Sequence, residues 1–320
     1  MDSVELLIQG QSSRYIPAVQ DDVAWETQRK NNPGKLTFKV YRDDVLQVEE
    51  GNPVKLIVDG QDVFSGFVFT ITRNNDPMLN ITAYDQIRYL KNKDTYIFKK
   101  HKASEIIAMI ATDYGLRLGT IADTGFTIIS RVEENTTLLD MIQNALDITT
   151  SNTKKLFILY DDNGKLTLTN SADMQVGLIV DADTSESFSY DTSIDTDVYN
   201  RVKLSYEDEK TGKRKIFTAQ DSGNMSKWGT LQYYESISDK QNAQNRANTL
   251  LALYNRKLKH LRINGVFGDL RVRAGCYVIV QLDLGDTVVH NFMMVERCVH
   301  HFSNREHRMD LELSGGEFSA

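Results

Sequence analysis

The sequence predicts an α+β fold that is mostly β: two β-barrel domains with an α+β domain between them and a long helix inserted in the second β domain. Three observations support this prediction. Apolar and polar residues alternate near both ends of the chain, as they do in strands with one buried face. In the middle, apolar residues recur at helical spacing instead. A Gly-x-x-Val sequence precedes an alternating run twice, at Gly51 and at Gly275.

Length and composition fit a soluble globular protein of two domains, or of one domain with a large insertion. The chain has 320 residues, of which 41% are hydrophobic and 25% are charged. Its formal net charge of -7 argues against a surface that grips nucleic acid, because phosphate binding requires clustered Lys and Arg. Met1–Gln9 has no secretion signal, and no run reaches the ~20 apolar residues of a membrane span. We therefore expect a protein that folds in the cytoplasm, or that leaves the cell by a route other than Sec.

Residues 1–90 are predicted to form the first β-barrel domain. Lys35–Tyr41 alternates strictly, and Val54–Val58 alternates again before Asp59-Gly60, a strong signal for a two-residue hairpin. Gly66 lies inside the returning run and indicates a bulge or a bend, as the corners of small barrels need. Several short strands joined by tight turns are typical of a small barrel or a sandwich.

Residues 91–190 are predicted to form the α+β domain. Ser104–Tyr114 places its apolar residues on one helical stripe, and Gly115 is a natural cap for its C-terminus. Thr137 begins a sequence like a capping box, with Asp in place of the usual Glu or Gln, and opens a second helix. A hairpin follows, with its turn at Asp161–Gly164.

Residues 191–320 are predicted to form the second β-barrel domain. Asn200–Tyr206 alternates, and a charged turn leads into a returning strand. A helix over about residues 238–260, opened by Ser238 and Gln241, interrupts this domain before the closing β run. Its apolar positions at helical spacing are Ala243, Ala247, Leu250, Tyr254, Leu258 and Leu261.

The two Gly-x-x-Val sequences resemble each other beyond the motif itself. After Gly51 come an alternating strand, a turn at Asp59-Gly60 and a returning run. After Gly275 come an alternating strand, a turn at Leu284–Asp286 and a returning run. Such short apolar patterns also arise by chance. The residues alone therefore leave two alternatives open: a structural repeat, in which both glycines start equivalent strands, or coincidence.

The closing β run contains residue types that bind metals, but not at metal-binding spacing. The residues concerned are His290, Glu296, His300, His301, Glu306 and His307. No HxH or HExxH occurs, and His300 and His301 point to opposite faces of a strand. We therefore expect no metal and no cofactor, and polar positions on a half-exposed sheet. Cys276 and Cys298 lack a CxxC partner; two buried free thiols are favoured over a disulfide, which neighbouring strands would also allow.

No catalytic residues are predicted. Acidic clusters adjoin turn signals, where Asp serves backbone geometry; they are Asp21-Asp22, Glu49-Glu50, Glu133-Glu134, Asp161-Asp162 and Glu207–Glu209. A pair of acids at glycosidase distance stays open, because that distance depends on the fold. There is no G-x-S-x-G, P-loop or G-x-G-x-x-G sequence. The basic and aromatic segment Tyr96–Lys102 fits a solvated domain junction better than a contact with a partner.

Several segments resemble one protein family in their order and spacing. They are Ala83–Leu90, Phe98–Ile107, Asp113–Leu116, Asn135–Asp140, Asn200–Val202, Trp228–Gln232, the helix ending near Leu253, Arg273–Gly275 and Val295–His300. Together they resemble the baseplate hub proteins of contractile-tailed phages, prophages and phage-tail-like bacteriocins, the phage late control D family, and most of all those of prophages in Gram-positive bacteria. None of these segments is a catalytic signature; the resemblance rests on their order along most of the chain.

The resemblance implies an assembly role. Hub proteins of this type contain two tail-tube-like β-barrels, and three copies form a pseudo-six-fold ring that joins the hexameric tail tube to the trimeric spike. The implied partners are further copies of the chain, the tube protein and the spike protein, with tape-measure and other baseplate proteins as further candidates. The resemblance also implies assembly in the bacterial cytoplasm and a place in the baseplate of a phage tail or tail-like particle. It favours Gly51 and Gly275 as starts of equivalent strands and identifies no interface residues.

Two other functions stay open as alternatives. Some hub proteins carry or are fused to a peptidoglycan-cleaving domain, so one alternative is a tail-associated peptidoglycan hydrolase. No lysozyme or peptidase motif is visible, which favours a protein that is not an enzyme. The other alternative is a β-rich carbohydrate-binding or adhesin module. Such modules usually show an exposed aromatic platform, but the two tryptophans, Trp25 and Trp228, lie in different predicted domains.

Overall fold

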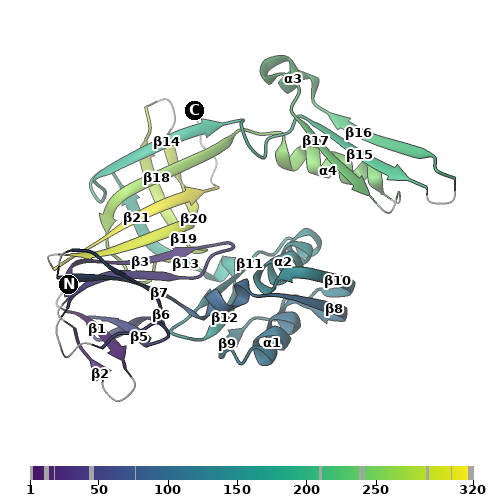
Figure 1. Cartoon of the computed structure of the whole chain (residues 1–320). Coiled ribbons are helices and arrows are strands. Elements are labelled where there is room, and N and C mark those ends of the chain that lie inside the picture. The colour runs from purple at the N-terminus through teal and green to yellow at the C-terminus, as the bar shows by residue number, and fades with distance from the viewer. Residues whose placement is uncertain are drawn as a thin grey trace. The chain divides into compact units, whose positions relative to one another are not determined.

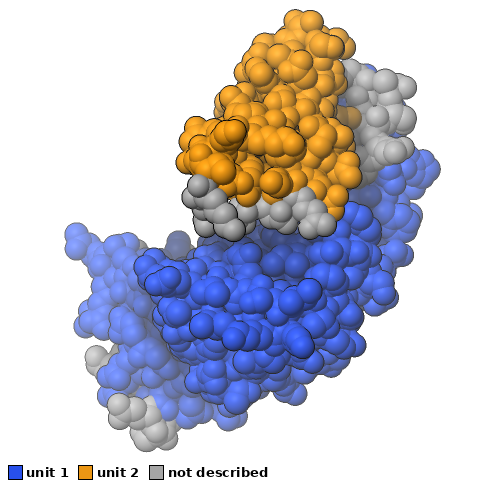
Figure 2. Space-filling model, turned by 90° about the vertical axis from the view of Figure 1, so that its right-hand side faces the viewer, with its two compact units in different colours: residues 1–189, 262–320 blue, residues 190–261 orange. Residues whose placement is uncertain are grey.

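The computed structural model of the chain describes residues 3–10, 14–17, 19–42, 47–75, 77–208, 211–237, 240, 242–285, 288–303 and 305–315. These residues form a mostly β structure with few helices, which confirms the predicted fold class (Figure 1). They divide into two compact units, residues 1–189 with 262–320 and residues 190–261, and each unit is described by itself (Figure 2). None of the described helices is long and apolar enough to cross a membrane.

Thirteen of the described strands form one sheet. Its N-terminal strands are β1 (Val4–Gln9), β2 (Arg14–Tyr15), β3 (Val19–Gln28), β4 (Lys35–Tyr41), β5 (Pro53–Val58), β6 (Gln61–Arg73) and β7 (Met78–Tyr84). Its C-terminal strands are β13 (Gln175–Asp181), β14 (Ser187–Ser193), β18 (Leu258–Phe267), β19 (Tyr277–Asp283), β20 (Val288–Ser303) and β21 (Glu306–Ser314). The strand order is β14-β18-β21-β20-β3-β4-β7-β6-β5-β1-β2, and beside this path β19 pairs with both β20 and β13. The path does not close on itself among the described strands, so the two β-barrels remain a prediction.

Strand β20 joins the N-terminal and C-terminal strands into this single sheet. It pairs with β19 from Val288 to Met294 and with β3 from Arg297 to Phe302. Over its second part it also pairs with β21. Because β20 is 16 residues long, it can serve these pairings in succession. The two β regions are therefore continuous through backbone hydrogen bonds.

The first predicted hairpin is confirmed, whereas the glycine in its second strand does not make the predicted bulge. Asp59 and Gly60 both have positive φ, 49° and 77°, as a tight turn between β5 and β6 requires. Gly66 pairs in regular register with Val54, so it makes no bulge. A Cβ atom there would lie 2.3 Å from the carbonyl oxygen of Tyr84. The close approach of the neighbouring strand therefore requires glycine.

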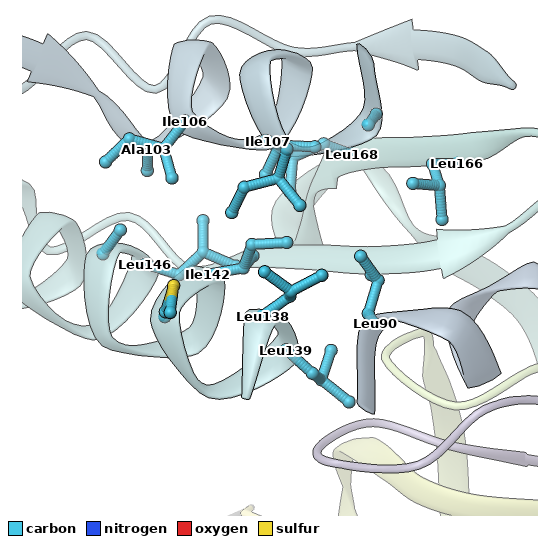
Figure 3. Packing of buried hydrophobic residues seen from close by; sticks show 14 of the residues in the cluster. Leu90, Ala103, Ile106, Ile107, Leu138, Leu139, Ile142, Leu146, Leu166 and Leu168 are labelled. Carbon is cyan, nitrogen blue, oxygen red and sulfur yellow. The ribbon is translucent and has the colours of Figure 1, made fainter. Parts of the chain in front are cut away.

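The α+β region packs two helices against two small sheets. It comprises the 3-10 helix η1 (Gln86–Lys91), β8 (Lys93–Lys102), α1 (Ala103–Asp113), β9 (Leu118–Ile121), β10 (Thr127–Thr137), α2 (Leu138–Thr153), β11 (Phe157–Asp161), β12 (Leu166–Asn170) and the 3-10 helix η2 (Ser171–Asp173). Strands β8 and β10 form one sheet, and β11, β12 and β9 form the other. Ile107, Leu138 and Leu168 are among the fully buried residues of the shared apolar core (Figure 3).

The predicted helix signals of this region are confirmed. The hydroxyl of Thr137 accepts a hydrogen bond from the amide of Asp140 at 3.1 Å, which caps the N-terminus of α2. Gly115 has a φ of 63° and follows α1, as expected for a glycine that ends a helix. The turn at Asp161–Gly164 connects the antiparallel strands β11 and β12.

Residues 190–261 contain a three-stranded sheet and two helices. The elements are β15 (Arg201–Glu207), β16 (Arg214–Gln220), α3 (Ser222–Trp228), β17 (Gln232–Ile237) and α4 (Ala243–Tyr254). Strand β15 lies between β16, which is antiparallel to it, and β17, which is parallel to it. Ala243 and Ala247 of α4 pack with Val202 and Leu204 of β15 in one buried cluster.

Helix α4 is shorter than predicted. It ends at Tyr254, and Leu258 and Leu261 belong to β18. The spacing of these leucines fits a helix, but Leu261 is buried between exposed neighbours, which is the alternation of a strand. The predicted cap residues, Ser238 and Gln241, lie outside the described residues.

Candidate functional site

Gly51 and Gly275 share a backbone conformation and a hydrogen bond. Gly51 has a φ of 91°, and its amide donates to the carbonyl oxygen of Val68 at 2.7 Å. Gly275 has a φ of 94°, and its amide donates to the carbonyl oxygen of Val295 at 2.7 Å. Each glycine precedes a strand, β5 or β19, and bonds to the strand that returns beside it, β6 or β20. Positive φ of this size explains why both positions hold glycine.

The likeness continues beyond the glycines. The amide of Val68 donates to the carbonyl of Asn52 at 2.9 Å, and the amide of Val295 donates to that of Cys276 at 2.9 Å. Just after each valine, the register of β6 with β7 and that of β20 with β21 shifts by one residue. The strand order β3-β4-β7-β6-β5-β1 thus corresponds, strand by strand, to the order β14-β18-β21-β20-β19-β13. The last pair differs, since β1 is antiparallel to β5 and β13 is parallel to β19.

The loops that hold the two glycines have different surroundings. The first glycine loop, Glu49–Asn52, is closed by hydrogen bonds between its own ends, and a Cβ atom at Gly51 would meet nothing within 4 Å. The second glycine loop, Asp269–Cys276, includes several buried residues. A Cβ atom at Gly275 would lie 2.6 Å from the side chain of Ile158. The second loop is therefore enclosed by other parts of the chain.

The second glycine loop contacts both β3 and the α+β region. The amide of Ala274 donates to the hydroxyl of Thr27 at 2.9 Å. The guanidinium of Arg273 donates to the carbonyl oxygen of Asp161 at 2.8 Å and lies 3.9 Å from the ring centroid of Tyr160. One loop thus connects the N-terminal strands, the α+β region and the C-terminal strands.

Arg273 belongs to a cluster of enclosed charged groups with Asp85 and Asp161. Burial lowers the pKa of Arg273 and raises the pKa of both carboxyl groups, and the charge of Asp161 raises the pKa of Asp85 further. Asp85 accepts hydrogen bonds from the amides of Gly34 at 2.8 Å and Ile87 at 3.0 Å. Asp161 accepts one from the turn that follows it. We name this group the Asp85–Asp161–Arg273 cluster; no local sequence pattern marks Asp85 or Arg273.

The pairing of β3 with β20 has its own charged contacts. Glu26 forms ion pairs with Arg297 at 2.7 Å and with Lys35 at 2.6 Å. Burial by itself raises the pKa of Glu26, but these hydrogen bonds outweigh it and lower the pKa to about 2. Arg29 pairs with Glu296 at 2.6 Å just beyond. Charged side chains therefore link β3 to both β4 and β20.

His300 is fully buried where β20 pairs with β3, not half-exposed as predicted. Its ring stacks on Trp25 with the centroids 4.6 Å apart. Its Nδ1 lies 2.8 Å from Nε2 of His307, and its Nε2 lies 2.9 Å from the carbonyl oxygen of Val272. Burial lowers the pKa of His300 to about 3 and that of His307 to about 4. Both rings are neutral near pH 7, so His300 donates from Nε2 to Val272 and accepts at Nδ1 from His307.

The other candidate ligands serve contacts within the sheet. No group of three or more described His, Cys, Asp or Glu side chains is arranged to hold a metal ion. His290 lies 3.2 Å from the side chain of Gln281. Cys276 and Cys298 are buried free thiols, as predicted. Burial raises the pKa of Cys276 to about 11 and raises that of Cys298 as well, so both thiols stay protonated.

The predicted solvated acidic clusters divide into exposed and buried ones. Asp161 is 7% exposed and Glu133 is 5% exposed, so the interpretation of both as solvated turn residues is wrong. Glu133 forms an ion pair with the arginine two positions before it. Glu207 is exposed and pairs with Arg214 at 2.9 Å. The side chains of Asp21 and Asp22 lie outside the described part of the structure.

The basic and aromatic segment Tyr96–Lys102 forms most of strand β8. The rings of Tyr96 and Phe98 stack with centroids 5.4 Å apart, and Phe98 is buried in the α+β core. Lys102 pairs with Asp123 at 2.9 Å. The aromatic residues of this segment therefore contribute to the core rather than to a basic-aromatic surface.

Comparison with known proteins identifies the family. A family model described as YqbQ-like matches residues 23–314. The chain belongs to the YqbQ-like family. It is 32% identical, over 312 residues and 94% of each chain, to the uncharacterized protein YqbQ of Bacillus subtilis strain 168. It is 31% identical, over 311 residues and 94% of each chain, to XkdQ, a protein of the phage-like element PBSX of the same strain.

Solved tail proteins share the fold of this YqbQ-like chain. The 43 kDa tail protein of prophage MuSo2 from Shewanella oneidensis has a TM-score of 0.70 at 12% identity, covering 97% of this chain and 98% of that one. A tail protein from Neisseria meningitidis MC58 has a TM-score of 0.69 at 13% identity, covering 98% and 97%. The Escherichia coli type VI secretion protein c3393, described as similar to the T4 tail proteins gp27 and gp5, has a TM-score of 0.57 at 10% identity, covering 99% and 79%. At these identities the likeness establishes the fold, which is that of phage tail proteins.

Proposed function

We propose that the chain is the structural hub of a contractile-tail baseplate. In this proposal three copies form a pseudo-six-fold ring that joins the hexameric tail tube to the trimeric spike. The partners are two further copies of the chain, the tube protein and the spike protein, with tape-measure and other baseplate proteins as further neighbours. The chain is assembled in the bacterial cytoplasm and works in the baseplate of a phage tail or a tail-like bacteriocin.

The matching geometry at Gly51 and Gly275 carries this proposal. The two corresponding strand orders, β3 to β1 and β14 to β13, would each be one tube-like module, and each glycine would start the equivalent strand of its module. Three chains would then present six modules. A closed ring is built from heterologous contacts. Six alternating modules would match a hexameric tube, while the three whole chains would match a trimeric spike.

The relatives support the tail setting of this proposal. XkdQ is by name a protein of a phage-like element. The likeness of the c3393 protein to gp27 and gp5 connects the fold with tail proteins of bacteriophage T4. The PBSX relative aligns over nearly the whole chain, so the tail setting is proposed for the entire sequence rather than for one part.

Electron microscopy tests the proposed hub. The full chain is produced with its cognate tube and spike proteins, and the complex is imaged and weighed by mass photometry. We expect three copies of the chain between one tube hexamer and one spike trimer. A different copy number, or a chain found outside the tube–spike junction, would contradict the proposal.

We propose no catalytic step for the chain. The Asp85–Asp161–Arg273 cluster supports this, because its two carboxyl groups are buried and accept hydrogen bonds from backbone amides of the chain itself. Zymography on peptidoglycan provides the test. The purified full chain should leave the layer intact where a lysozyme control clears it; clearing by the chain would establish a hydrolase instead.

A further inference from the structure

The two compact units carry net charges of opposite sign. Residues 190–261 contain 12 Lys and Arg against 9 Asp and Glu, a formal charge of +3. The whole chain carries -7, so residues 1–189 with 262–320 carry -10. Such an asymmetry favours contacts between unlike surfaces of neighbouring molecules and opposes contacts between like surfaces.

One face of the sheet in residues 190–261 is left uncovered by the helices of the same unit. Val202 and Leu204 of β15 point toward α4 and join its buried cluster. Alternate strand residues point the other way. We name that side the open face; it contains Arg201, Lys203, Ser205, Glu207, Arg214, Ile216, Thr218, Gln220, Gln232, Tyr234 and Ser236. The cross-strand register places Lys203 opposite both Thr218 and Tyr234.

The open face combines apolar groups with cations. Tyr234 is 51% exposed and Ile216 is 43% exposed. Hydrogen bonds with two serines lower the pKa of Tyr234, and the nearby cations Arg214 and Lys203 lower it further. Exposed aromatic groups beside arginine are characteristic of protein–protein interfaces.

Among the described residues, the only ion pair of the open-face cations is an exposed one. Arg201 and Lys203 form no ion pair among the described residues, and Nε of Arg201 is enclosed without a hydrogen-bond acceptor. Arg214 pairs with Glu207, but both side chains are more than half exposed, at 60% and 57%. Exposed pairs of this kind are weak. The open face therefore retains positive charge for an outside partner.

We propose that the open face binds an acidic surface of residues 1–189 and 262–320 on a second copy of the chain. This inference rests on the proposed ring and names one contact within it. Copies of a chain with a net charge of -7 repel one another, and a positive unit placed against a neighbour offsets that repulsion locally. A contact between two different surfaces of one chain is heterologous, as a closed three-fold ring requires.

Nucleic acid fits the open face less well. Phosphate binding depends on several clustered cations, whereas the open face has three, one of them paired with Glu207. Fluorescence anisotropy with a short DNA duplex checks this alternative. Binding that Lys203→Glu abolishes would assign the face to nucleic acid and overturn the inference.

Charge reversal on the full-length chain tests the contact between copies. The variant carries Lys203→Glu and Arg214→Glu. The matched control carries Lys227→Glu and Lys257→Glu, which change the charge equally at exposed positions of the same unit outside the sheet. Sedimentation velocity should show that the unaltered chain associates at low salt and less at high salt. The open-face variant should associate at least about tenfold more weakly, and the control should match the unaltered chain.

Two results would overturn the inference: equal association of the open-face variant and the control, or an unaltered chain that stays monomeric at low salt. These results can be distinguished from a failure of the hub proposal, which would show as the absence of a three-fold tube–spike particle. A three-fold tube–spike particle that assembles equally well with the open-face variant keeps the proposed function and removes this contact.

Carbodiimide cross-linking identifies the partner surface. The reagent joins a lysine amine directly to a carboxylate. In a mixture of unlabelled and heavy-nitrogen-labelled full chains, it should link Lys203 to an Asp or Glu of residues 1–189 or 262–320 in mixed-label peptide pairs. Links of Lys203 that occur only within one label would show an intramolecular contact and contradict the proposal.

Discussion

The two glycine loops place one backbone pattern in two environments. Gly51 and Gly275 have φ of 91° and 94° and equal hydrogen bonds to the returning strand. The first loop is open to space around Gly51, whereas Gly275 lies against Ile158. Two positions before the glycines stand Glu49, which is exposed, and Arg273, whose Nε is enclosed.

This comparison separates what the backbone requires from what the surroundings require. Positive φ makes glycine favourable at both positions, and this part should be equal in the two loops. The surroundings act on the second loop, where Arg273 connects to Asp161 and Ala274 to Thr27. Substitutions of the two glycines should therefore share the strain of positive φ, and substitutions in the second loop should in addition disturb its contacts.

Removing Arg273 should have the largest effect. Arg273→Met removes the hydrogen bond to the carbonyl oxygen of Asp161 and the positive charge that lowers the pKa of Asp85 and Asp161. Leaving enclosed charges without compensation costs up to about 3–5 kcal/mol of unfolding free energy. Glu49→Gln, the matched change in the first loop, should cost less than about 0.5 kcal/mol, as exposed substitutions do. Urea unfolding at pH 7 measures both.

Acidification sharpens this prediction. The pKa values of Asp85 and Asp161 are already raised by burial, and the loss of Arg273 should raise them further. At pH 5 both carboxyl groups then bind protons more readily in the folded chain, so the loss caused by Arg273→Met should be smaller than at pH 7. An equal loss at both pH values would mean that Arg273 acts through volume rather than charge.

Adding a methyl group to each glycine should separate the two loops next. Gly51→Ala brings only the strain of positive φ, about 1–3 kcal/mol. Gly275→Ala brings the same strain and an overlap with Ile158, at 2.6 Å, which adds about 1–3 kcal/mol. Chemical denaturation of both variants measures the difference. Ile158→Ala removes both Cγ atoms that the new methyl group meets, so it should cost less in the Gly275→Ala chain than in the unaltered chain. Equal costs would mean that the second loop is not limited by Ile158.

Local signals were sufficient to predict much of the fold. The cap at Thr137, the glycine at Gly115 and the turn at Asp59-Gly60 each act within a few residues, so their sequence patterns determine their conformation directly. The helical stripe of α1 was predictable for the same reason. Even the repeat of Gly51 and Gly275 was visible as a motif, although its hydrogen bonds were not.

Contacts between distant segments could not be predicted from such local patterns. His300 is buried because β20 pairs with β3 and places it opposite Trp25, and nothing near His300 in the chain announces that pairing. Asp161 looked like an ordinary turn residue because its turn signal is real, but it is buried, and Arg273 from a distant segment donates to its carbonyl oxygen. The excess of basic residues in 190–261 could be counted in the sequence only after the structure had given the boundaries of that unit.

The smallest predicted effect is a dependence of stability on pH that arises from His300 in the second β region. Burial lowers the pKa of His300 to about 3, helped by the neighbouring His307 and Arg273 and opposed by Asp269 and the bond to Val272. The unfolded chain binds a proton near pH 6.5, so the stability due to neutral His300 is complete above that pH and is lost as the pH falls below it. The loss should be about 1 kcal/mol between pH 6.5 and 5.5.

The variant His300→Gln isolates this effect, because it keeps hydrogen-bonding groups but does not titrate. Asp85 and Asp161 oppose the histidine, since their raised pKa values favour the folded state on acidification, but both chains share them. The stability gap between the unaltered chain and His300→Gln should therefore shrink by about 1 kcal/mol over that range. His290→Gln, at an exposed position of the same strand, serves as the matched control. A constant gap for His300→Gln would mean that His300 has the same pKa in the folded and in the unfolded chain, so that the second β region does not shield the ring from water.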